Sequence, residues 1–225
     1  MGFMTINKET VAKTGGGGSY ITTSGLYDVT IGALTLDINE HGARNIGAYI
    51  TLDGENYQML YGALPLDLFD GSQEIESNIN TLMRLAVIAG LDDISDPIEA
   101  TLPIGKDGAD KDTMILDDFT DLQCKLWVKA EYSKGKKNGV IYENRIIKDA
   151  FTTDGASADE ITNETEAGVK MSKREKYFTE VKYKDTDEAE VAKWIEDGRP
   201  KTAAIGGTPS AKPKVVAKKR FGSSK

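Results

Sequence analysis

Two alternating runs within residues 122 to 151 constrain the fold of this chain more than any other feature of its sequence. The first run places five apolar side chains on one face: Leu122, Cys124, Leu126, Val128 and Ala130. A period of two residues is typical of a strand with one side buried in a core. A basic turn with two glycines, residues 133 to 139, leads to the second run, which ends at Phe151. The pattern predicts a β-hairpin.

The polar face of the first run carries Trp127 between Lys125 and Lys129. The turn adds three more cations: Lys134, Lys136 and Lys137. An indole outside the core can stack a nucleic-acid base, and ammonium groups around it can neutralise phosphates. We therefore expect single-stranded nucleic acid to bind here. A solvated hairpin tip is the alternative interpretation of the basic turn.

The net charge of −8 is unevenly distributed. Residues 201 to 225 contain seven cations and no acid, so residues 1 to 200 hold 21 cations against 36 acids, a charge of −15. A body of this charge repels DNA at long range, so any DNA site on it must be a local basic patch. Two roles are open for Lys218, Lys219 and Arg220: salt-dependent phosphate contacts, or binding to the acidic body in cis.

We expect four segments: a flexible glycine-rich arm over residues 1–24, a core over 25–151, an extension over 152–200 with a short strand and helix, and a disordered basic tail over 201–225. A single cysteine excludes an intramolecular disulfide, and no apolar run approaches the length of a membrane span. We expect a cytoplasmic protein without a membrane partner.

Within the core, alternating residues predict strands over 26–36, 46–52 and 57–61. A helix with an N-cap at Ser72 follows over residues 75–89 and ends at Gly90, and residues 92–121 read as a connection with one extended piece near 98–104. Three strands, a helix and two strands is the order of the OB-fold, a five-stranded barrel. The predicted class is therefore mainly β with minor α, although a small α+β sandwich shares this order.

In an OB-fold the ligand crosses strands two and three between two loops. The loops here are residues 37–45, which include His41 and Arg44, and residues 133–139. The nucleic-acid-binding residues that we expect are Arg44, Tyr49, Tyr57, Lys125, Trp127, Lys129, Lys134, Lys136 and Lys137. The aromatic residues would stack bases and the cations would meet phosphates. For at least half of the aromatic residues on these strands, packing in the core is the stronger interpretation.

In the extension, alternation predicts a strand over residues 176–183, and Asp185 with Glu188 predicts the start of a helix that contains Val191, Trp194 and Ile195. We expect Trp194 to dock this helix on the core rather than to contact a ligand.

No catalytic, cofactor or metal site is predicted. His41 has no second histidine and Cys124 no partner, which argues against zinc or a nucleophile and base pair. The six aspartates between residues 107 and 121 miss the spacing of a calcium-binding loop and read as a solvated acidic segment. We expect a protein that is not an enzyme.

The chain resembles the single-stranded DNA-binding proteins of tailed bacteriophages over about residues 20–151. The resemblance rests on SGLYDV at residues 24–29 after a glycine-rich entry, LAVIAGL at 85–91, and the closing hairpin with Asn144, Arg145 and Ile146. It implies a protein that coats single strands in phage replication and recombination and recruits polymerases or recombinases. Many members end in an acidic tail, whereas this chain ends in a basic one.

Two other functions remain open. The acidic body could imitate nucleic acid or dock on a basic protein, as an interaction or inhibitor protein would. The aspartates could serve a metal-dependent nuclease. The sequence makes no prediction of oligomeric state.

Overall fold

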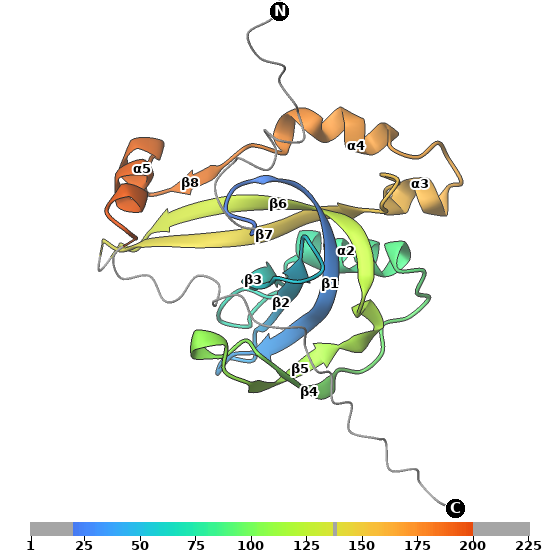
Figure 1. Cartoon of the computed structure of the whole chain (residues 1–225), viewed down its shortest axis with the longest axis horizontal. Helices are drawn as coiled ribbons and strands as arrows, with labels where there is room; N and C mark the ends of the chain where they lie inside the picture. Colours follow the sequence, from blue (N-terminus) through green and yellow to red (C-terminus); the bar gives the residue numbers. More distant parts are fainter. Residues whose placement is uncertain (1–19, 137–138, 200–225) are drawn as a thin grey trace, which may run out of the picture.

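The computed structural model describes residues 20–136 and 139–199 and shows a mainly β protein (Figure 1). The strands are β1 (Gly25–Ile38), β2 (Arg44–Thr51), β3 (Tyr57–Pro65), β4 (Ile98–Leu102), β5 (Lys111–Leu116), β6 (Leu122–Lys134), β7 (Ile141–Phe151) and β8 (Lys182–Lys184). The helices are α2 (Glu76–Ile88), α3 (Ala158–Thr162), α4 (Val169–Arg174) and α5 (Glu188–Glu196), with 3₁₀ turns η1 (Lys106–Gly108), η2 (Asp117–Phe119) and η3 (Glu175–Tyr177).

The long strand β1 organises the sheet. One edge of β1 pairs with β2, which pairs in turn with β3. The other edge pairs with β6 through residues 25–31 and with β5 through residues 34–36. β5 continues to β4, and β6 continues to β7 and β8. Every pairing is antiparallel except that of β6 with β8.

The predicted five-stranded barrel is not closed in the structure. Within the described residues, no ladder of backbone hydrogen bonds joins β3 to β7, so the eight-stranded sheet stays open. The predicted connection over residues 92–121 is also wrong in part, because it contains the hairpin β4–β5. Buried apolar residues occur only at the end of β5, at Ile115 and Leu116. Because this stretch is too short to show an alternating pattern, the sequence did not predict a strand there.

The main core lies between the inner faces of β1, β2, β3, β6 and β7 and the helix α2. Leu82, Leu85 and Ala86 bury the apolar side of α2 in this core, as its helical period predicts. The predicted N-cap at Ser72 is wrong, since the helix begins at Glu76. Gly90 adopts a φ of +71° just after the helix, the left-handed conformation that favours glycine at a C-terminus.

The first described residues belong to the core rather than to an arm. The backbone N–H of Ile21 donates to Gln58 Oε1 at 2.7 Å, and its side chain is 1% exposed. Ser24 is buried as well and accepts a hydrogen bond from the N–H of Ala130. The rest of the predicted arm, residues 1–19, and the predicted tail lie outside the described residues.

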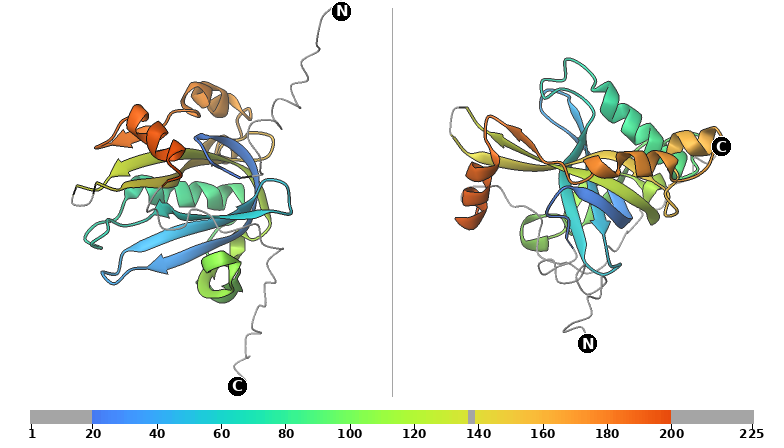
Figure 2. Two further views of the ribbon diagram at one scale, coloured as in Figure 1. Left: turned by 60° about the vertical axis from the view of Figure 1, so that its left-hand side comes forward. Right: turned by 90° about the horizontal axis from the view of Figure 1, so that it is seen from above.

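The extension and the hairpin β4–β5 lie on opposite sides of the molecule (Figures 1 and 2). α5 packs Val191 and Trp194 on Ala130, Tyr132 and Ile141 of the β6–β7 hairpin, so the predicted docking role of Trp194 is confirmed. The predicted strand over 176–183 is wrong for most of its length, because residues 175–177 form η3 and only Lys182–Lys184 pair as β8. None of the described helices combines the length and the apolar composition needed to cross a bilayer.

We predict that Leu85→Ala lowers the free energy of unfolding by about 2–5 kcal/mol, because a fully buried leucine leaves a cavity between α2 and the sheet. The matched control is Met83→Ala on the same helix, whose side chain is 54% exposed and should cost less than about 0.5 kcal/mol. Urea denaturation measures both. Equal losses in the two variants would contradict the packing of α2.

Candidate nucleic-acid interface

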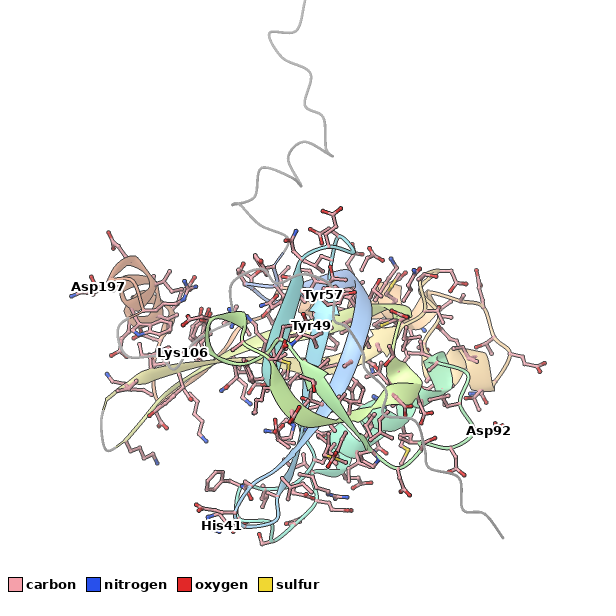
Figure 3. All side chains as sticks on the ribbon, turned by 60° about the horizontal axis from the view of Figure 1, so that its bottom comes forward. His41, Tyr49, Tyr57, Asp92, Lys106 and Asp197 are labelled. Carbon is pink, nitrogen blue, oxygen red and sulfur yellow. The ribbon has the colours of Figure 1, made fainter. Side chains whose placement is uncertain are left out.

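The structure buries two of the predicted stacking residues. Tyr49 and Tyr57 are 2% and 8% exposed, with their rings stacked at 4.8 Å and 14°. They form a second core with Leu102, Ile104 and Ile115, since the hairpin β4–β5 covers the outer face of β2 and β3. Figure 3 shows both tyrosines within the sheet, away from His41 at the end of β1. Both rings are therefore part of a core in this structure and are not accessible to a base.

Arg44 lies at the end of β2, where two carboxylates already hold its guanidinium. Its Nε and Nη2 donate to the two oxygens of Asp67 at 2.8 Å, and Nη2 also donates to Glu74 at 2.7 Å. These hydrogen bonds raise the pKa of Arg44. The bidentate pair ties β2 to the chain after β3 and leaves Arg44 little capacity for a phosphate.

We predict that this pair makes stability depend on acid pH. Hydrogen bonds from Arg44 lower the pKa of Asp67 to about 2, whereas the pKa of an aspartate in the unfolded chain is about 3.9. The contribution of Asp67 is therefore complete above that value and is lost as the pH falls through about 2. The difference in unfolding free energy between the native chain and Asp67→Asn should be largest at about pH 6 and shrink toward about pH 2.

The control for this prediction is Asp92→Asn, an exposed carboxylate on the loop after α2. Its effect on stability should change little over the same range. A difference for Asp67→Asn that is constant with pH would show that the carboxylate of Asp67 does not hold the strands together in its charged form.

Trp127 shares a face of β6 with Lys125 and Lys129, as predicted, but the extension covers it. The ring of Phe178 meets the indole edge-on, with centroids 5.4 Å apart, and the guanidinium of Arg174 lies 5.9 Å from the indole centroid. Within the described residues, the buried Nε1 of Trp127 has no hydrogen-bond acceptor. Trp127 is therefore half-buried, with Phe178 and Arg174 against its indole, and it is not the freely exposed ring that the prediction requires.

Strong contacts hold the cover in place. Arg174 forms an ion pair with Asp149, whose side chain is 1% exposed, and Arg84 of α2 lies 3.7 Å from the same carboxylate. Phe178 is 7% exposed and also meets Phe151. Removing Arg174 would leave a buried charge without its main partner.

Most of the predicted phosphate-binding lysines are paired with carboxylates. Lys125 meets Asp28 at 2.5 Å, Lys129 meets Glu180 at 3.1 Å, and Lys134 meets Glu190 on the other face, beside α5. The hydrogen bond from Lys134 lowers the pKa of Glu190. Lys136 is exposed and has no carboxylate within ion-pair distance among the described residues, and Lys137 lies outside them.

A basic surface that the sequence analysis missed lies across β7, β6 and β8. Glu131 of β6 is directly opposite Asn144 and Lys182, and Ser133 is opposite Tyr142 and Lys184, so these side chains share one face. We call it the outer hairpin face, and we define it by Lys129, Glu131, Ser133, Tyr142, Asn144, Lys148, Lys182 and Lys184. The alternation of Tyr142 with Glu143 and the run Lys182, Tyr183, Lys184 were the signals that could have located it.

The outer hairpin face holds four lysines. Glu131 accepts from Lys148 at 2.9 Å and from Lys182 at 3.1 Å, and Glu180 of the extension pairs with Lys129. Burial acts to raise the pKa of Glu131, but the hydrogen bonds from Lys148 and Lys182 lower it overall. Two carboxylates against four ammonium groups leave a local positive charge, and Tyr142 adds a ring that is 44% exposed.

The single cysteine and the aspartates after β4 are the other titratable groups that the sequence analysis considered. Burial raises the pKa of Cys124 to about 12, so its thiol stays protonated. Among the described residues, no three histidine, cysteine or carboxylate side chains come together as metal ligands. Of the aspartates between residues 107 and 121, Asp112 accepts from Thr101 and Asp118 from Ser95. Comparison with protein-family models, curated proteins and solved structures gives no match for this chain.

We predict that Phe178→Ala uncovers Trp127. In a Trp194→Phe background, where Trp127 is the only indole, acrylamide quenching should rise because the ring that shields the indole is gone. The free energy of unfolding should fall by about 3–5 kcal/mol. The control is Tyr177→Ala, whose side chain is 40% exposed and whose loss should leave the quenching unchanged. Unchanged quenching in Phe178→Ala would contradict the cover.

Proposed function

We propose that this protein binds single-stranded DNA on the outer hairpin face with little sequence preference. The supporting observation is that four lysines share one face with Tyr142, on a chain whose first 200 residues carry a charge of −15. Binding to single strands combines phosphate neutralisation by a basic surface with stacking on an aromatic ring. The face offers both, whereas the rings of Tyr49 and Tyr57 are buried and that of Trp127 lies half-buried under Phe178.

The order of the strands supports the same class of protein. We propose that β1, β2, β3, β6 and β7 form an OB-fold barrel of the partly open kind, with β4–β5 inserted before the last hairpin. α2 spans the opening, since Asn78 donates to the carbonyl of Pro65 on β3 and Thr81 donates to that of Lys148 on β7. An OB-fold would place the outer hairpin face beyond the barrel, on the part of β6–β7 that extends past the end of the pairing with β1.

Lys182 and Lys184 are the sharpest test of this proposal, because both are exposed and lie on the short strand β8. We predict that Lys182→Gln with Lys184→Gln weakens binding of a fluorescent oligodeoxythymidine and reduces the slope of log affinity against log salt by about 1.4, or about 0.7 for each lost phosphate contact. Tyr142→Ala should cost about 1–3 kcal/mol of binding free energy through lost stacking.

The matched control removes the same charge from the opposite side of the molecule, with Lys106→Gln and Lys111→Gln on the β4–β5 hairpin. This variant should keep the salt slope of the native chain. Equal losses in the two double variants would assign binding to net charge alone and contradict the face. An absence of binding at low salt would contradict the function, and degradation of the strand with Mg²⁺ would favour the nuclease alternative.

A further inference from the structure

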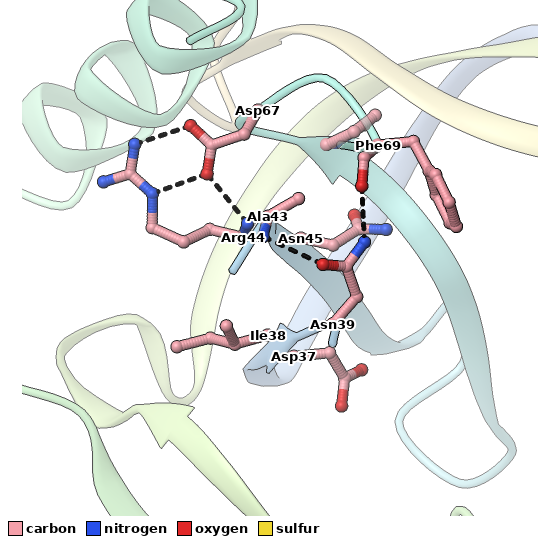
Figure 4. Close-up of a pocket in the computed structure, with 9 residues that line it drawn as sticks. Asp37, Ile38, Asn39, Ala43, Arg44, Asn45, Asp67 and Phe69 are labelled. Atoms are coloured by element: carbon pink, nitrogen blue, oxygen red, sulfur yellow. Dashed lines mark hydrogen bonds and ion pairs between the residues drawn. The ribbon is translucent and has the colours of Figure 1, made fainter. Parts of the chain in front are cut away.

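The end of the sheet opposite the extension carries a rigid, acidic and apolar projection. We call residues 37–45 and 65–74 the acidic tip (Figure 4). Asn39 ties its two segments together: Nδ2 donates to the carbonyl of Phe69 at 2.8 Å, and Oδ1 accepts from the N–H groups of His41 and Ala43. Gly71 has a φ of +70°, and a Cβ there would lie 2.5 Å from the carbonyl oxygen of His41. The tip is thus built to one conformation.

This rigid support presents apolar side chains to solvent. Phe69 is 76% exposed, Ile38 62% and Leu68 44%, and the ring of His41 meets Phe69 edge-on at 5.5 Å. Scattered exposed apolar residues are ordinary. Here Ile38 and Phe69 both line one pocket and Leu68 precedes Phe69 on the same segment, and we call these three side chains the exposed patch.

A pocket of about 280 Å³ opens beside the patch, between the end of β1 and the chain after β3. Asp37, Asn45 and Phe69 contribute to its lining. The Oδ1 atom of Asn45 is buried and accepts no hydrogen bond within the described part of the chain. A ligand that donates hydrogen bonds and brings apolar groups would satisfy both Asn45 and Phe69.

The charge of the tip selects a cationic ligand. Its two segments contain five carboxylates, Asp37, Glu40, Asp67, Asp70 and Glu74, and a single guanidinium, Arg44, which two of them already hold. A nucleic acid would meet repulsion here, whereas lysine and arginine side chains would be attracted.

We propose that the acidic tip binds residues 212–221 of this same chain. That segment has five cations and no acid, and its apolar residues Val215, Val216 and Phe221 match the exposed patch. The 12 residues between Arg199 and Lys212 can span roughly 40 Å when extended. This reach is comparable with the width of a domain of this size, whose radius of gyration is roughly 16 Å.

The docking keeps the basic segment on the protein at low salt. Rising salt weakens the attraction between the segment and the acidic tip, and the segment is then released. The proposal is independent of DNA binding on the outer hairpin face, since it concerns the protein without a ligand and lysines that are not part of that face.

Paramagnetic relaxation of the full-length chain tests the proposal. A nitroxide is attached at Ser224→Cys, and the native Cys124 stays unlabelled because it is 1% exposed and its thiol remains protonated. At low salt we expect loss of the amide signals of His41 and Phe69, while those of α3 persist. The matched control replaces Lys212, Lys214, Lys218, Lys219 and Arg220 with glutamine, and the tip signals should then return.

Phe69→Ala, which removes an exposed side chain, should restore part of the tip signals without unfolding the protein. Signals at the tip that persist in the native chain, or equal losses across the whole protein, would overturn the proposal. A second sample mixes isotope-labelled chains that carry no nitroxide with unlabelled chains that carry one. Loss of the tip signals in this mixture would show that the segment docks on a second copy, which would overturn docking within one chain. Titration of the same samples with the oligodeoxythymidine measures DNA binding separately, so docking of the segment and DNA binding can each fail without the other.

Discussion

The arrangement of this protein depends on a mismatch in length between two paired strands. β6 pairs with β1 only as far as Val128, yet it continues to Lys134. Beyond that point β6 would have a free edge, and Ala130 and Tyr132 would expose an apolar face outside the main core. β8 pairs with the free edge and α5 covers the apolar face, so the extension completes the hairpin. A bare edge of this kind is prone to pairing with other chains.

The strands of the hairpin and meander could be predicted from sequence because each has a period that is visible locally. What covers their polar faces could not be predicted in this way, because the covering segments are distant in the sequence. Tyr49 and Tyr57 lie outside the main core, and β4–β5 forms a second core over them. Phe178, 51 residues after Trp127, covers the indole in the same manner.

The charge distribution explains why the predicted lysines are poor markers of a site. On a body with 36 acids, a cation usually finds a carboxylate nearby, and Lys125, Lys129, Lys134 and Arg44 each do so. A site for an anion must then arise where cations from several strands outnumber the local carboxylates. On β7, β6 and β8 only the register of three strands brings this about. The sequence indicates a strand near β8 but shows neither its partner strand nor its register.

Charge of opposite sign is thereby separated along the molecule. The outer hairpin face gathers lysines on the part of β6–β7 that outruns β1, while the acidic tip gathers carboxylates where β1 turns into β2. A polyanion approaching such a molecule is attracted at one end and repelled at the other, which orients it before contact. The basic segment after α5 would experience the opposite field. The same separation that would steer a strand to the hairpin would draw this segment toward the tip, as we propose.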